Sequence, residues 1–148
     1  MCAGDGAEAA ALRSLSERHG VSQQIHFLGF RNDVDRLMLA ADIFVLSSTV
    51  ESFGMVLLEA MVSRTPVIAP NGGGPKEIVV DREYGLLCSP GDVGEITDAI
   101  QELLDEPGLR ESLAACAYSR AIGVFSVSQM AGETLDVYAT AVAGKSYE

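Results

Sequence analysis

Apolar positions along the chain fall into short runs separated by patterns of helical spacing. Short apolar runs predict buried strands over residues 1–3, 25–28, 43–46, 67–69 and 85–88. Apolar residues at helical spacing predict helices over residues 7–19, 34–41, 55–63, 75–79, 92–104 and 107–122, with a last helix that begins near residue 127. Strands that alternate with helices predict an α/β fold, a Rossmann-like three-layer α/β/α domain with a parallel sheet covered on both faces.

Several helix ends carry recognisable signals. Asn32 and Asp33 form an N-cap pair, Asp92 with Glu95 forms a capping box, and Pro75 suits a first helical position. Either Ser126 or Ser128 can cap the last helix. For that helix we expect these apolar side chains to make packing contacts: Met130, Leu135, Val137, Tyr138 and Ala141.

The helix after Gly54 is apolar almost all the way round, which is typical of a buried helix. Glu59 is the one charged residue in its middle. A carboxylate is almost never buried without a partner, because losing its hydration costs several kcal/mol. Two interpretations follow. Glu59 either forms a salt bridge or lies at the edge of the buried zone, or it faces a ligand pocket and accepts hydrogen bonds from hydroxyl groups.

The start of the same helix offers a second candidate binding feature. The backbone N–H groups of Gly54, Met55 and Val56 lack intrahelical acceptors, and such groups bind phosphate readily. A phosphate there, with hydroxyl groups near Glu59 about one turn further along, describes a nucleotide or a nucleotide sugar. The run Gly72, Gly73, Gly74 after the next strand either lets the backbone approach another body closely or is a flexible surface loop.

Composition excludes several classes of protein. With 148 residues, 48% of them hydrophobic and 21% charged, the chain is long enough for one folded domain. A net charge of -11 argues against nucleic acid and against direct adsorption to anionic lipid. No signal peptide or membrane-spanning run is present, so we expect a cytoplasmic protein without direct membrane insertion.

The potential metal ligands are sparse. Cys2, Cys88 and Cys116 lie far apart without a CxxC pair, which indicates reduced thiols rather than a zinc site. There is no Asp-x-Asp or other carboxylate cluster that would hold Mg²⁺. We therefore expect no metal site.

Seven segments carry a family resemblance in the order in which they occur. They are residues 27–30 (Phe-Leu-Gly-Phe), 41–48, 51–54 (Glu-Ser-Phe-Gly), 59–61 (Glu-Ala-Met), 65–69, 73–79 and 84–87. Together they are similar to the retaining glycosyltransferases of the GT-B fold, group 1 (family four). The resemblance covers nearly the whole chain and implies the C-terminal, donor-binding half of a GT-B fold.

The resemblance implies roles for individual residues. Glu59 matches the carboxylate that binds the nucleotide ribose, and Glu51 matches the residue that contacts hydroxyls of the donor sugar, our candidate catalytic residue. The loop and helix start whose backbone N–H groups hold the sugar and diphosphate correspond to Ser52, Phe53, Gly54, Met55 and Val56. Gly29 and Phe30 match the loop near the nucleobase, and residues 72–74 border the donor cleft.

The implied reaction transfers a sugar from a UDP-, GDP- or ADP-sugar to an acceptor hydroxyl with retention of configuration, and it needs no cofactor besides this donor. The acceptor-binding N-terminal domain has no counterpart here, and neither does the first strand of the donor-binding domain. We expect residues 1–148 to bind donor weakly, to be inactive without an acceptor domain or separate subunit, and to self-associate through an uncovered sheet edge. The alternatives are a non-catalytic nucleotide-sugar-binding or interaction module and, less favoured, an enzyme resembling nucleotide-sugar epimerases.

Overall fold

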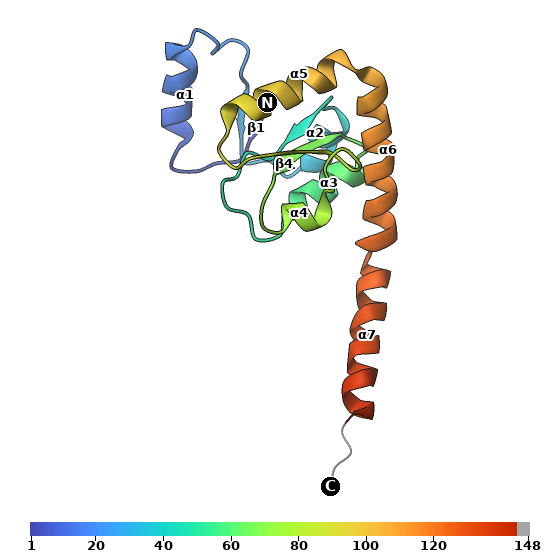
Figure 1. Cartoon of the computed structure of the whole chain (residues 1–148). Helices are drawn as coiled ribbons and strands as arrows, with labels where there is room; N and C mark the ends of the chain where they lie inside the picture. The colour runs from blue at the N-terminus through green and yellow to red at the C-terminus, as the bar shows by residue number, and fades with distance from the viewer. Residues whose placement is uncertain (145–148) are drawn as a thin grey trace. The chain divides into compact units, whose positions relative to one another are not determined.

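The computed structural model describes residues 1–144, which form two compact units, Met1–Leu37 and the chain from Met38 onward. Helices and strands alternate through most of both units (Figure 1), and every paired strand runs parallel to its neighbour. The mixed α/β architecture predicted from the alternating pattern is confirmed.

The first unit contains β1 (Cys2–Ala3), α1 (Ala9–Arg18) and β2 (Phe27–Gly29). β1 pairs with β2, and the Cys2 N–H donates to the His26 carbonyl at 2.8 Å. β2 begins two residues later than predicted, because a turn closed by the Gln24 N–H on the Val21 carbonyl (2.9 Å) precedes it.

α2 (Val34–Leu39) follows a local ion pair instead of the predicted side-chain cap. The Arg31 guanidinium donates to both carboxylate oxygens of Asp33, at 2.8 and 2.7 Å, and lowers the pKa of that carboxyl. Asp33 directly precedes α2 as predicted, but its carboxylate accepts from Arg31 and from no N–H group of the helix. Its backbone carbonyl accepts from Arg36 and Leu37 at the helix start.

The second unit is built on a three-stranded parallel sheet in the order β3–β4–β5. Its elements are β3 (Phe44–Val45), α3 (Met55–Val62), β4 (Val67–Pro70), α4 (Pro75–Ile78), β5 (Leu86–Cys88), α5 (Val93–Asp105), α6 (Pro107–Val124) and α7 (Val127–Ala143). β4 is central and buried at all of its residues. α3 and α4 contact β4, and α5 contacts both β4 and β5 (Figure 1).

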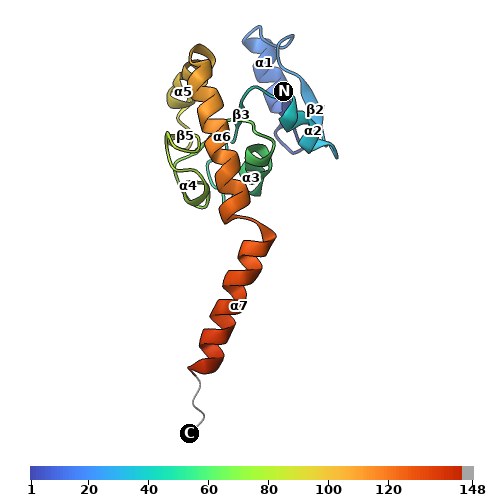
Figure 2. The same cartoon turned by 90° about the vertical axis from the view of Figure 1, so that its right-hand side faces the viewer.

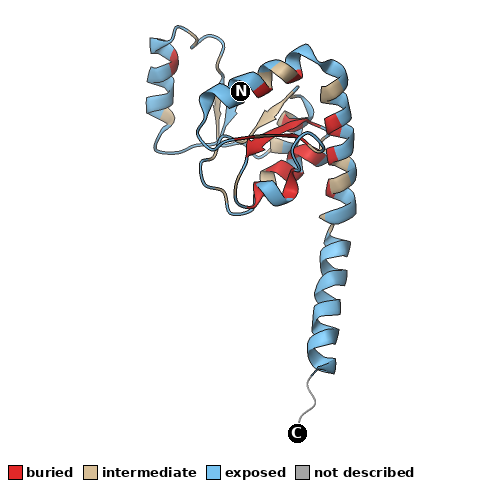
Figure 3. Cartoon of the chain, viewed as in Figure 1, coloured by how far each residue is buried: buried red, intermediate tan, exposed pale blue. Residues whose placement is uncertain are grey.

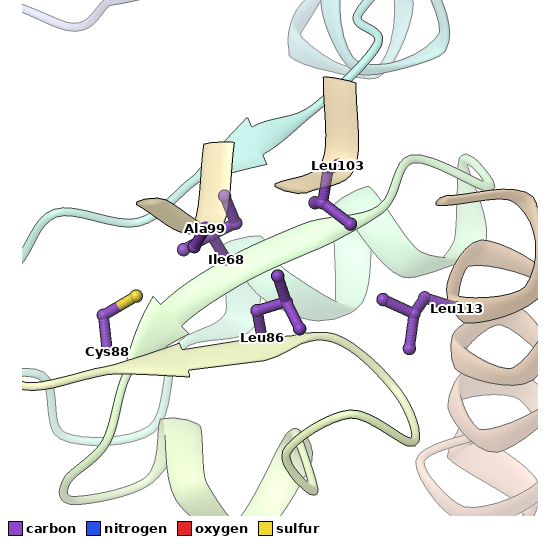
Figure 4. Packing of buried hydrophobic residues seen from close by; sticks show 6 residues of the cluster. All are labelled: Ile68, Leu86, Cys88, Ala99, Leu103 and Leu113. Carbon is purple, nitrogen blue, oxygen red and sulfur yellow. The ribbon is translucent and has the colours of Figure 1, made fainter. Parts of the chain in front are cut away.

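One apolar cluster joins the sheet to α5 and α6. Figure 4 shows Ile68 of β4 and Leu86 of β5 facing side chains that come from the two helices. Leu103 of α5 is fully buried there, and Leu113 of α6 closes one side. Apolar residues at helical spacing along α5, namely Ile96, Ala99, Ile100 and Leu103, pack in this cluster, whereas Leu104 is half exposed.

The exit of α3 is held against its surroundings by two residues. Arg64 adopts a left-handed backbone conformation with φ of 57°, and its guanidinium lies 3.9 Å from the centroid of the Tyr118 ring on α6. The next residue, Thr65, is buried, and its hydroxyl donates to the Met38 carbonyl at 2.7 Å. These contacts anchor the end of α3 before β4 begins.

The capping box of α5 is half formed. The Asp92 carboxylate accepts from the Glu95 N–H at 3.0 Å, as predicted. The Glu95 carboxylate does not return to Asp92 and instead accepts from the hydroxyl (3.1 Å) and backbone N–H of Ser89. The box therefore also ties α5 to the residue after β5.

α7 is a regular helix with no buried residue. Ser126 rather than Ser128 is its cap, and accepts from the Gln129 N–H at 3.2 Å. Figure 3 shows α7 exposed along its length, and the predicted packing contacts of its apolar residues are wrong. The helical pattern was sufficient to form the helix, but no described element covers its apolar side.

Candidate functional site

The loop from Glu51 to Gly54, which we call the 51–54 loop, leads from β3 into α3 within the second unit. Gly54 is buried and has φ of 99°, a left-handed conformation that L side chains rarely adopt. A Cβ atom on Gly54 would also lie 3.1 Å from Cδ1 of Leu57. The glycine therefore allows the sharp change of direction at which α3 begins.

The first backbone N–H groups of α3 have no acceptor among the described residues. The Leu57 N–H donates to the Gly54 carbonyl at 2.8 Å, whereas the N–H groups of Gly54, Met55 and Val56 make no hydrogen bond there. Such N–H groups at a helix start, together with the helix dipole, favour an anion. An anionic ligand group at this position would meet donors that nothing in residues 1–144 already occupies.

Glu59 is exposed, which agrees with a place at the edge of the buried zone and not with a charge buried in the middle of the helix. α3 buries only one side, formed by Leu57, Leu58, Ala60 and Met61. Met55, Glu59 and Val62, spaced at i, i+4 and i+7, lie on the uncovered side, where Met55 and Val62 are 59% and 49% exposed. Glu59 forms no ion pair within the described residues. Its role at a ribose stays a prediction that rests on the resemblance.

The remaining residues of the 51–54 loop are partly accessible. Glu51 is half-buried and Ser52 is exposed. Phe53 is 38% exposed, and its ring meets that of Phe125 edge to face, with centroids 6.3 Å apart and an interplanar angle of 68°. An aromatic pair of this geometry restricts the loop at Phe53.

The glycine run after β4 lies directly against the 51–54 loop. A Cβ atom on Gly73 would be 2.5 Å from the Glu51 carbonyl oxygen, and one on Gly74 would be 2.2 Å from Cα of Phe53. The body that this backbone approaches closely is thus the chain's own loop. Sequence reasoning left the partner open, although three glycines followed by Pro75 signalled a close approach.

A small hollow lies at the carboxyl ends of β3, β4 and β5, the edge at which open parallel sheets bind ligands. Its polar lining comes from Ser47 and Ser48 after β3 and from Ser89 after β5. Cys88 also lines the hollow, and burial raises the pKa of its thiol. Sequence reasoning did not single out these residues as a group, because their proximity depends on the order of the strands.

Gly29 and Phe30 belong to the first unit. Gly29 ends β2 in a left-handed conformation with φ of 65°, and Phe30 is 76% exposed. An exposed aromatic ring can stack on a base, and the assignment of these two residues to the nucleobase stays a prediction.

Two negative findings hold for the part of the chain that the structure describes. Residues 1–144 contain no group of three or more histidine, cysteine, aspartate or glutamate side chains that could hold a metal ion. None of the described helices combines the length and the apolar character needed to cross a bilayer.

Comparisons with known proteins agree with the resemblance. Residues 1–120 match the model of the family Glycosyl transferases group 1. The lipopolysaccharide core biosynthesis glycosyltransferase LpsE of Rhizobium meliloti is 35% identical over 123 residues, which are 83% of this chain and 36% of that protein. Glycogen synthase of Mycobacterium tuberculosis is 33% identical over 145 residues, 97% of this chain and 35% of the enzyme. The chain thus spans about a third of the length of these relatives.

Solved structures with the same fold include the HepE protein of Anabaena in complex with UDP-glucose. Its TM-score is 0.84 at 33% identity, over 91% of this chain and 40% of HepE. The C-terminal domain of the group 1 glycosyl transferase LpcC from Francisella tularensis has a TM-score of 0.74 at 33% identity, over 80% of this chain and 62% of that one. The chain belongs to the group 1 glycosyl transferases, and its fold is that of the Rossmann-like C-terminal domain of their GT-B architecture.

Proposed function

We propose that residues 51–59 form the donor site of a retaining glycosyltransferase, which transfers a sugar from a nucleoside diphosphate to an acceptor hydroxyl in the full-length enzyme. The diphosphate lies at the start of α3, the ribose hydroxyls at Glu59 and the sugar at Glu51. Gly29 and Phe30 border the base. The acceptor is bound by a domain or subunit outside residues 1–148.

The observation that carries this proposal is that the start of α3 presents backbone N–H donors. The N–H groups of Gly54, Met55 and Val56 have no acceptor among the described residues, and carboxylates at Glu51 and Glu59 lie on either side of them in the sequence. Negative charge builds on the diphosphate as the sugar departs, and preorganised N–H donors stabilise it. Carboxylates accept hydrogen bonds from ribose and sugar hydroxyls. These donors and acceptors match a nucleoside-diphosphate sugar.

The proposed donor class has support from HepE, which is 33% identical to this chain over the matched region and was crystallised with UDP-glucose. UDP-sugars are therefore the first donors to test. A helix N-terminus contributes about 0.3–2 kcal/mol toward an anion. Because this is a small term, we expect the 148-residue chain to bind donor weakly.

Titration calorimetry with UDP, UDP-glucose, and GDP- and ADP-sugars tests the proposal. Replacing Glu59 by alanine removes a charged hydrogen-bond acceptor worth about 1.5–3 kcal/mol, which corresponds to roughly 10- to 150-fold weaker binding of both UDP and UDP-glucose. Glu51→Gln should weaken UDP-glucose much more than UDP, since only the former carries the sugar.

Glu111→Ala is the matched control, because Glu111 is an exposed glutamate on α6 whose side chain forms no hydrogen bond or ion pair within the described residues. It should leave both affinities unchanged. Binding that Glu59→Ala does not weaken would remove the ribose assignment. If the chain binds none of the nucleotides, it has no donor site of its own.

A further inference from the structure

Arg120 on α6 forms hydrogen bonds to the end of α4. Its Nε donates to the Ile78 carbonyl at 2.8 Å, and its Nη2 donates to the Glu77 carbonyl at 2.9 Å. These carbonyls belong to the last two residues of α4, where the helix has no intrahelical donors for them. The guanidinium supplies two parallel N–H groups and a positive charge at a helix C-terminus, both of which are favourable.

The same guanidinium also lies on two aromatic rings. It is 4.7 Å from the Tyr84 centroid and 5.5 Å from the Phe125 centroid, within the range of cation–π attraction. Phe125 in turn meets Phe53 of the 51–54 loop edge to face. A first line of contacts therefore runs from Arg120 through Phe125 to the loop.

A second line of contacts runs through α4. This helix begins at Pro75, directly after the glycines whose backbone lies against Glu51 and Phe53. α4 has only four residues, so a bond at its end constrains its beginning. Both lines start at one side chain on α6, which runs beside α3 (Figure 2), and both end at the 51–54 loop.

We propose that Arg120 is a positioning residue for sugar binding: through α4 and Phe125 it holds the 51–54 loop in the conformation that presents Glu51 to the donor sugar. Arg120 itself does not touch the donor. This inference rests on the proposed function of the loop. Arginine is required because a lysine ammonium lacks the planar fork that reaches two carbonyls and lies flat on rings.

Amide hydrogen exchange tests the positioning directly, without any ligand. The reporters are three hydrogen-bonded amides near the 51–54 loop and α4. The N–H groups of Leu57, Glu77 and Val79 donate to the carbonyls of Gly54 (2.8 Å), Gly74 (2.9 Å) and Pro75 (2.8 Å), respectively. In Arg120→Met these amides should exchange about tenfold faster, because local opening becomes easier. Amides in the middle of α5 should keep their wild-type rates.

Titration provides the second readout. In Arg120→Met the affinity for UDP-glucose should fall by about tenfold and that for UDP by much less, since the sugar depends on the loop. Arg120→Lys should recover part of the exchange protection. Arg110→Met is the matched control on the same helix, since the Arg110 side chain forms no hydrogen bond or ion pair within the described residues, and it should change neither readout.

The outcomes separate this inference from the proposed function. Faster exchange at the three reporters with a lower preference for UDP-glucose over UDP supports positioning. Equally faster exchange in α5 would indicate global destabilisation and would overturn the inference. Unchanged exchange at the three reporters, or an unchanged preference for UDP-glucose over UDP, would overturn it as well. If the wild-type chain binds no nucleotide but the reporters exchange faster in Arg120→Met, the proposed donor site is refuted. Arg120 would then still be the residue that holds the 51–54 loop in place.

Discussion

At the scale of single residues, the glycines after β4 determine how the candidate site is assembled. Gly73 and Gly74 bring one backbone segment against another at distances that leave no room for a Cβ atom. Atoms of the backbone cannot move aside as the end of a flexible side chain can. The 51–54 loop therefore depends on the absence of side chains in a different loop.

Replacing Gly74 by alanine should destabilise the chain by about 1–3 kcal/mol, the usual cost of overpacking, and weaken donor binding. The reason is that the new Cβ atom would be 2.2 Å from Cα of Phe53. Urea unfolding measures the change in free energy. Gly123→Ala is the control, because nothing lies within 4 Å of its Cβ position on α6. That variant should gain about 0.5–1 kcal/mol, and a loss at both positions would contradict this account.

At the scale of elements, α5 and α7 are both amphipathic helices but differ in what covers them. α5 places Ala99 and Leu103 in the cluster with the sheet, whereas α7 buries no residue. Helical periodicity reports which side of a helix is apolar. It does not report whether another element reaches that side.

Two leucine substitutions measure this difference. Leu103→Ala removes a fully buried side chain and should cost about 2–5 kcal/mol in the free energy of unfolding. Leu135→Ala on α7, where Leu135 is 66% exposed, should change it by less than about 0.5 kcal/mol. Thermal and urea unfolding of both variants provide the comparison. A cost above 1 kcal/mol for Leu135→Ala would mean that α7 is covered in solution.

At the scale of the whole molecule, the exposed edge of β1 in the first unit is the candidate surface for association of two chains. Both residues of β1 are exposed, and β2 is the strand with which β1 pairs in the described part of the chain. Unpaired backbone groups at a strand edge are a template for pairing with a second chain. The expected self-association through a sheet edge thus stays a prediction with a defined location.

Light scattering over a range of protein concentrations should reveal an average mass above that of one chain. Cys2→Lys places a charge on β1 and should return the protein to the monomer, because charged edges resist pairing. Leu135→Lys on α7 is the control and should leave the association unchanged. A monomer at all concentrations contradicts the prediction, and the reverse response of the two variants would assign association to α7.

The sequence by itself determined the order of strands and helices and the family. Local signals were sufficient for these, because short apolar runs, Pro75 and the Asp92 cap act over a few neighbouring residues. The motif around Glu51 and Glu59 was readable for the same reason. Element ends differed by a few residues, as at the start of β2, which a turn precedes.

Only the tertiary structure decided which faces are covered and which loops meet. The apolar sequence of α3 predicted a buried helix and left the place of Glu59 open, but the sheet and α6 cover a single side and leave this carboxylate exposed. The contact of Gly74 with Phe53, and the bonds from Arg120 to α4, join residues far apart in the chain. Such contacts depend on how strands are ordered and helices packed, which no local pattern of residues encodes.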